Sequence, residues 1–222
     1  MTYSPLNTAI VITDPQNDFL SPDGATWELV GNSVTENRTV EHLEELIQGA
    51  KSTGYQVFVS PHYYYPTDDD WQFGGTVENL MHDINMFARS GSLSLEGFGG
   101  SGADWVEPLA KLVGDGETIV VSPHKVYGPQ TNDLALQLRK RGISSVILAG
   151  MSANLCVEAH LRQLTEDGFE VHVVKDATAA AQHPELGDGY EAAVINFNYI
   201  ASGVITTSEA LEALDADSRL GT

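Results

Sequence analysis

The chain of 222 residues has little cysteine, few basic residues and no long apolar run. Its single cysteine, Cys156, cannot form a disulfide within the chain, which is typical of proteins in a reducing compartment. No apolar run approaches the roughly 18 residues that a membrane-spanning helix needs. Residues 1–7 lack the basic and apolar segments of a signal peptide. We therefore expect a cytoplasmic protein that does not enter a membrane.

Positive charge is also scarce. Lys and Arg number 11 against 31 Asp and Glu, which gives a formal charge of −20. Such a surface repels a phosphate backbone, so we exclude nucleic acid as a partner and expect a small-molecule ligand. The same scarcity draws attention to Lys125, which ends an apolar stretch.

Short apolar runs rich in Val and Ile alternate with segments of helical spacing. The runs predict strands over residues 9–13, 56–60, 118–122, 145–149 and 170–174, with a weaker sixth over 203–206. The spacing predicts helices over residues 35–53, 132–141 and 155–167, each closed by a glycine. This order is typical of βαβ units, so we expect an α/β fold with an open parallel sheet, formed by one domain over residues 1–222.

Two stretches interrupt this rhythm, residues 61–71 and 90–105, and both are long enough to form lids or oligomer contacts. The second contains a G-x-G-x-x-G pattern at residues 97–102. A dinucleotide-binding loop with that pattern follows the first strand and opens a helix, which this one does not. We therefore expect no cofactor.

Ligands of open α/β sheets bind beyond the carboxyl ends of the strands. The residues that follow the predicted strands are Asp14, His62, the pair His124 and Lys125, and the loop 151–156. An acid, a lysine and a thiol are thus predicted at one edge of the sheet.

These residue types suit nucleophilic catalysis. Cys156 lies near the start of a predicted helix, whose free N–H groups favour a thiolate and lower the pKa of the thiol. Burial raises the pKa of Asp14, which then suits a general base. The ammonium of Lys125 would stabilise both partners, and the backbone N–H groups of Ser152 and Cys156 would bind an oxyanion. Taken singly, each side chain also has a structural interpretation: an inert buried thiol, a turn carboxylate and a surface lysine.

Three stretches together resemble the isochorismatase-like cysteine hydrolases, over about residues 9–206. They are residues 12–20 around Asp14, residues 125–134 beginning at Lys125, and residues 149–157 around Cys156. The resemblance implies a three-layer αβα Rossmann-like sandwich with a six-stranded, mostly parallel sheet. It also implies a catalytic triad of Asp14, Lys125 and Cys156, a cis peptide between Met151 and Ser152, and a homo-oligomer, either dimer or tetramer.

Substrate contacts are expected from Phe19, His62 and Tyr127. Nicotinamidases of this family carry an Asp-x-His metal site after the second strand, whereas this chain has Ser60-Pro-His62, so we expect no metal. Isochorismatases proper generally lack the nucleophilic cysteine. Cys156 therefore favours hydrolysis of a C–N bond in a small amide, ureide or carbamoyl compound. A vinyl-ether hydrolase and a non-catalytic metabolite-binding protein remain the alternatives.

Overall fold

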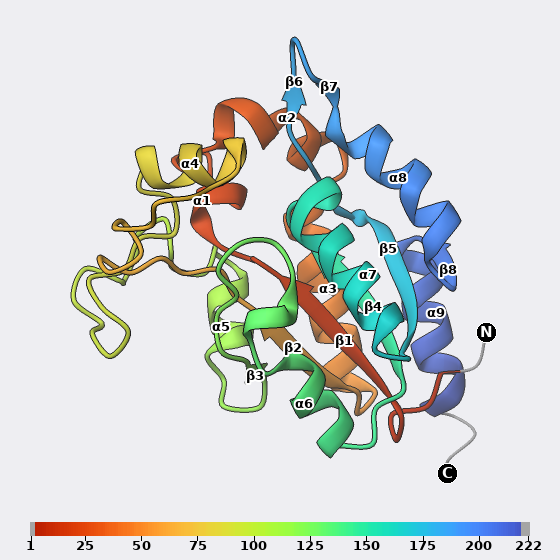
Figure 1. Cartoon of the computed structure of the whole chain (residues 1–222). Helices are drawn as coiled ribbons and strands as arrows, with labels where there is room; N and C mark the ends of the chain where they lie inside the picture. Colours follow the sequence, from red (N-terminus) through yellow and green to blue (C-terminus); the bar gives the residue numbers. More distant parts are fainter. Residues whose placement is uncertain (1–2, 219–222) are drawn as a thin grey trace.

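A six-stranded parallel sheet forms the centre of the computed structural model, which describes residues 3–218 (Figure 1). The strand order is β3-β2-β1-β4-β5-β8. The strands are β1 (Thr8–Thr13), β2 (Gln56–Ser60), β3 (Ile119–Val120), β4 (Ser145–Gly150), β5 (Glu170–Thr178) and β8 (Gly203–Ile205). Every neighbouring pair in this sheet is parallel, as expected for βαβ units.

Helices cover both faces of the sheet because its strands are apolar on both sides. Ile10 and Ile12 of β1 pack with α3 (Thr39–Ser52), α5 (Leu109–Val113) and α9 (Thr207–Ser218). Ala9 and Val11 of the same strand pack with α6 (Leu134–Lys140), α7 (Glu158–Glu166) and α8 (Gly189–Ile200). Alternate residues of a strand point to opposite faces, so two separate apolar layers form. The three-layer αβα sandwich is confirmed.

The remaining elements lie around the carboxyl ends of the strands or beside them. They are α1 (Asn17–Leu20), α2 (Trp27–Glu36), α4 (Thr76–Asp83), the hairpin β6 (Gln182–His183) and β7 (Gly187–Asp188), a 3₁₀ turn (Pro129–Thr131) and a π-helical turn (Ala153–Val157). In Figure 1, α1, α2 and α4 lie near the end of the sheet where β1 finishes. Within the described residues, no helix is both long and apolar enough to cross a membrane.

Two predicted elements differ in extent. The helix expected over residues 35–53 begins at Thr39, as α3, because Arg38 adopts a left-handed conformation with φ of 50° and residues 35 and 36 end α2 instead. The third strand keeps only two residues, since it lies at the edge of the sheet and the Ser122 N–H donates to the carboxylate of Asp133. Five α-helices in the described chain, α1, α4, α5, α8 and α9, were not predicted, and α2 was predicted only at its last two residues.

The direction in which successive strands are added to the sheet reverses between β1 and β4. The connections from β1 run to β2 and β3 on one side, and β4, β5 and β8 lie on the other. A crevice at such a switch point is where ligands of open α/β sheets bind. Asp14 directly follows β1 and the loop of Cys156 follows β4, so the fold brings these two residues to that point.

Gly150 permits the close approach of β4 to β1. Its φ is +112°, and a Cβ there would lie 2.1 Å from the carbonyl oxygen of Thr13. We expect Gly150→Ala to lower the free energy of unfolding by at least about 3 kcal/mol, from the unfavourable φ and the overpacking together. The control Gly54→Ala has a comparable positive φ but open space around it, and should cost about 1 kcal/mol. Equal losses in urea unfolding would contradict this account.

Candidate active site

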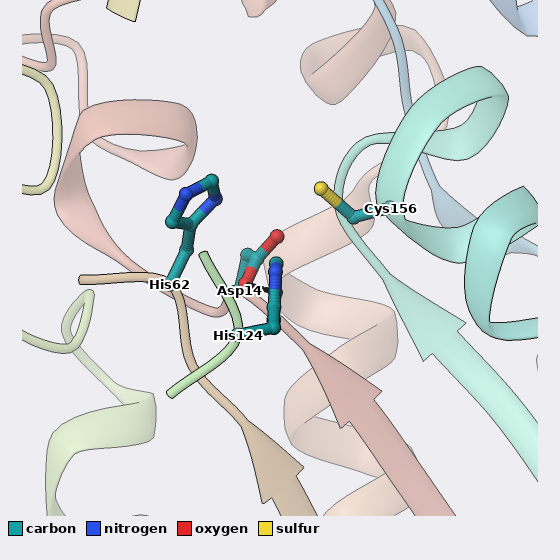
Figure 2. Close-up of side chains that lie close together, drawn as sticks. All are labelled: Asp14, His62, His124 and Cys156. Carbon is teal, nitrogen blue, oxygen red and sulfur yellow. Dashed lines mark hydrogen bonds and ion pairs between the residues drawn. The ribbon is translucent and has the colours of Figure 1, made fainter. Parts of the chain in front are cut away.

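Four buried side chains from the ends of four successive strands of the sheet meet in one cluster. Asp14 follows β1, His62 follows β2, His124 follows β3 and Cys156 follows β4 (Figure 2). One side-chain N, O or S atom from each lies within 4.8 Å of those from the others. The sequence predicted Asp14 and Cys156 at one edge of the sheet, and the structure brings them together there.

The carboxylate of Asp14 is fully buried and has two different surroundings. Its Oδ1 accepts a hydrogen bond of 2.8 Å from Nε2 of His124. Its Oδ2 has no hydrogen-bond partner among the described residues, and the carboxylate interacts with the Cys156 thiol. Figure 2 shows one carboxylate oxygen directed toward the sulfur. The backbone of Asp14 has φ of 47° and is held by a hydrogen bond from its N–H to Ser60.

Burial sets the protonation of this pair. It raises the pKa of Asp14 to about 6, as the sequence predicted for a general base. Burial and the neighbouring Asp14 carboxylate raise the pKa of Cys156 well above its ordinary value, whereas the sequence predicted a lowered one. The free N–H groups at the start of the helix do lower the pKa, but desolvation outweighs them because the side chain is only 3% exposed.

The loop after β4 presents backbone donors to the sulfur. The N–H groups of Ser152 and Cys156 both interact with the thiol of Cys156. These are the two groups that the sequence predicted as an oxyanion hole. The peptide between Met151 and Ser152 is cis, as the family resemblance implied. Cys156 itself lies in the π-helical turn immediately before α7.

The ammonium of Lys125 is not among the groups that act on Asp14 or Cys156, which differs from the expected ammonium between them, although its charge reaches His62. Its ammonium donates to the carboxylate of Asp68 and lies 3.7 Å from the ring centroid of Tyr65. Successive residues after β3 point in opposite directions, so His124 faces the cluster and Lys125 faces away from it. The imidazole of His124 therefore occupies the place beside Asp14.

Two further histidines complete the surroundings of Asp14. The ring of His62 donates from Nε2 to the carbonyl oxygen of Lys125, and its Nδ1 has no partner among the described residues. The ring of His160 donates from Nδ1 to the carbonyl oxygen of Cys156, so its Nε2 accepts from the hydroxyl of Ser60. Burial lowers the pKa of His62, His124 and His160 to about 3 each, so all three are neutral.

The predicted substrate contacts lie around this cluster at different distances from the sulfur. His62 belongs to the cluster. Tyr127 is partly buried and interacts electrostatically with Cys156. Phe19 is buried and packs edge-on against Phe87, which stacks on the ring of His62. Phe19 thus reaches the cluster through Phe87.

Sequence reasoning gave no role to Gln16, although it lies in the first family-like stretch. Its side chain is fully buried and donates from Nε2 to the carbonyl oxygens of His62 and Ala103, both at 2.9 Å. Its Oε1 accepts from the backbone N–H of His62, also at 2.9 Å. Gln16 therefore fixes the backbone that carries the His62 ring. The sequence signal that could have indicated this role is a glutamine two residues after the carboxylate that ends the first strand.

Asp14, His62, His124 and Cys156 each offer an atom of a type that binds metal ions, and these atoms lie within 4.8 Å of one another. In this arrangement Oδ1 of Asp14 accepts the hydrogen bond from Nε2 of His124, so those two atoms bind each other rather than an ion. An ion bound by this set would have the Cys156 sulfur among its ligands. The sulfur would then not be free as a nucleophile.

The Isochorismatase domain model matches residues 8–209 of the chain. Ureidoacrylate amidohydrolase RutB of Enterobacter sp. is 27% identical over 231 residues, covering 98% of this chain and 94% of RutB. Among solved structures, a cysteine hydrolase from Pseudomonas syringae pv. phaseolicola has a TM-score of 0.78 at 22% identity and covers 98% of this chain and 96% of its own. Nicotinamidase/pyrazinamidase PncA from Bacillus subtilis has a TM-score of 0.65 at 22% identity, with coverages of 90% and 99%. The chain therefore belongs to the isochorismatase family.

The three neutral histidines predict how stability depends on pH. Their folded pKa values of about 3 lie below the ordinary 6.5, so their contribution is present above pH 6.5 and is lost as the pH falls toward about 3. The raised pKa of Asp14 has the opposite effect, because it adds stability as the pH falls from about 6 toward the ordinary value of 3.8. One carboxyl group cannot offset three imidazoles. We expect the free energy of unfolding to fall as the pH is lowered below 6.5.

The variant His160→Gln should reduce this slope by about 1.4 kcal/mol per pH unit, the value for one proton. His183→Gln makes the same substitution in the partly exposed β6–β7 hairpin, outside the cluster, and is the control. The measurement is urea unfolding at several pH values between about 4 and 7. An unchanged slope in His160→Gln would show that this imidazole is not held neutral by burial.

Proposed function

We propose that this protein is a cysteine hydrolase that cleaves a C–N bond in a small amide, ureide or carbamoyl compound through a thioester on Cys156. The observation that carries the proposal is the arrangement at the sulfur. A buried carboxylate able to accept its proton, Asp14, and two backbone N–H groups, of Ser152 and Cys156, surround the same atom. Nucleophile, base and oxyanion donors are the three parts that acyl transfer requires.

The first half-reaction forms the thioester. Asp14 takes the proton of Cys156 as the sulfur attacks the carbonyl carbon, and the N–H groups of Ser152 and Cys156 stabilise the oxyanion. Asp14 then returns the proton to the departing nitrogen as the C–N bond breaks. Ammonia or an amine leaves.

The second half-reaction removes the acyl group. Asp14, again ionised, takes a proton from water, whose oxygen attacks the thioester carbon. Collapse of the second oxyanion breaks the C–S bond, and the thiol regains its proton. The carboxylate pKa of about 6 suits both directions of proton transfer near neutral pH.

The relatives support C–N rather than ether hydrolysis. The ureidoacrylate amidohydrolase and the nicotinamidase are both named for reactions on amide-type bonds. A vinyl ether offers no carbonyl for a thiolate to attack, so the buried Cys156–Asp14 pair would have no use in its hydrolysis. The pairing of these two side chains favours the amidohydrolase.

We also propose a cytoplasmic homo-oligomer. Large apolar side chains lie exposed on several segments of the described chain: Phe73 is 90%, Leu93 99% and Tyr199 87% exposed. Association with a second copy would remove apolar surface of this kind from water. Dimer and tetramer are both compatible with these positions.

Ammonia release from a panel of primary amides, ureides and carbamoyl compounds tests the proposed activity. We expect Cys156→Ala to lower turnover of a reactive compound by at least about 10³-fold and Asp14→Asn by about 10²–10⁴-fold, because each removes a chemical step. Asp115→Asn makes the same chemical change as Asp14→Asn, in the loop bound by Lys51, and should retain full activity. A chelator in the assay should change nothing.

Each alternative has its own outcome in these experiments. Ammonia release that survives Cys156→Ala would contradict the thioester mechanism. Turnover of isochorismate by both the wild type and Cys156→Ala would instead support the vinyl-ether hydrolase. Thermal stabilisation by a panel compound without any turnover would support a metabolite-binding protein.

A further inference from the structure

We propose that His124 is the positioning residue for Asp14, in the place that the family resemblance assigns to Lys125, and that the Asp14–Cys156 pair rests without a buried cation beside it. The inference rests on the proposed function of this pair as base and nucleophile. It makes the resting site a thiol and a carboxylate among neutral imidazoles, rather than a thiolate held by an ammonium.

The contact between His124 and Asp14 has the geometry of a positioning hydrogen bond. Nε2 of His124 lies 2.8 Å from Oδ1 of Asp14, and both side chains are fully buried. A carboxylate oxygen is an acceptor, so Nε2 carries the proton. The bond fixes the plane of the carboxylate and leaves Oδ2 for the Cys156 thiol. Figure 2 shows the imidazole of His124 beside the carboxylate and the Cys156 side chain directed toward the same cluster.

The other groups near Asp14 are neutral as well. The ring of His62 has its centroid 4.6 Å from that of His124, and the ring of His160 lies 5.1 Å away. Each of these two rings donates one proton to a backbone carbonyl, which fixes it in one neutral tautomer. Burial in each case disfavours the imidazolium. Among residues 3–218, the groups that act on the carboxylate are thus three imidazoles and the Cys156 thiol.

The groups that face Cys156 from the covering segments carry no positive charge either. Tyr64 and Tyr127 interact electrostatically with its sulfur, and Glu78 of α4 interacts with both tyrosines. Lys125 directly follows His124 in the sequence. Its ammonium is paired with the carboxylate of Asp68 and acts on the ring of His62, whose pKa it helps to lower. Within residues 3–218, nothing replaces the expected ammonium at the sulfur.

This arrangement decides where the thiol proton is before the reaction. A lysine ammonium beside Asp14 would favour the thiolate, because opposite charges stabilise each other strongly in a buried site. A neutral imidazole does not, so Cys156 stays protonated until the sulfur attacks. The proton then moves to Oδ2 of Asp14, while His124 keeps its own proton on Nε2.

The ultraviolet absorbance of the thiolate, followed as a function of pH, tests this inference. Cys156 is the single cysteine of the chain, so subtraction of the Cys156→Ser titration isolates its signal. We expect the wild type to be mostly thiol at neutral pH and to form thiolate as the pH rises further. His124→Lys should raise the thiolate fraction near neutral pH at least about tenfold, which corresponds to a shift of one unit in the pKa of the thiol. His124→Gln keeps a neutral N–H donor and should retain the wild-type profile.

Lys125→Met is the matched comparison, because it removes the neighbouring ammonium and leaves the imidazole. Its thiolate profile should stay within about twofold of the wild type at each pH. A clear shift in Lys125→Met, with none in His124→Lys, would overturn the proposal. The rate of alkylation by iodoacetamide is a second measurement, with the same expected ratios. If His124→Lys does not fold, an altered profile in His124→Gln or Lys125→Met still overturns it.

These titrations need no substrate. An enzyme that shows the expected thiol profile but turns over no amide would contradict the proposed function and leave the role of His124 supported. The opposite result, amide turnover with a thiolate already present at neutral pH, would contradict the role of His124 alone.

Discussion

A carboxylate buried at the end of an apolar parallel sheet is the constraint on which the site depends. Taking Asp14 out of water is costly unless hydrogen bonds compensate, and one of its oxygens finds a donor in His124. The other faces the thiol of Cys156. The same desolvation that raises the pKa of the carboxyl also keeps the neighbouring imidazoles neutral. One physical cause therefore sets the protonation of the base, the nucleophile and their surroundings.

Backbone contacts beyond the cluster maintain this burial. Gly150 lets β4 approach β1 so closely that the N–H of Met151 donates to the carbonyl of Thr13. Gln16 holds the backbone of His62 through both ends of its amide. Asp18 accepts a hydrogen bond of 2.6 Å from the N–H of Phe87, which ties the segment containing α4 to the end of β1. The polar residues Gln16 and Asp18 after β1 thus each have a structural use.

Much of this architecture could be predicted from the sequence. Apolar runs separated by helical spacing indicated the parallel sheet, and the rule that ligands bind beyond its carboxyl ends indicated Asp14, Cys156 and the loop of Ser152. The choice between His124 and Lys125 could not be made in the same way. Both follow the third strand, and chemistry alone favoured the lysine. The pairing of His62 with His124 as parallel neighbours decides which side chain faces the carboxylate, and that register is a tertiary property.

The pKa of Cys156 could not be predicted from the sequence for a similar reason. Proximity to a helix start correctly indicates N–H groups at the sulfur, but it contains no information on how deeply the thiol is buried. The segment that contains α4 received no prediction, because it lies between residues 61–71 and 90–105, the two stretches expected to form lids or oligomer contacts. Its contacts, such as the paired backbone groups of Tyr64 and Arg89, join residues that no local pattern relates.

The central claim is that Cys156 forms a covalent acyl intermediate. Rapid acid quenching during turnover of an amide from the panel, followed by mass spectrometry of the peptide that contains Cys156, tests it most directly. The account predicts a mass increase equal to the acyl group on Cys156 during the steady state, and none in Cys156→Ser treated alike. Turnover by the wild type with no adduct on Cys156, either in the wild type or in the slower variant Asp14→Asn, would contradict it.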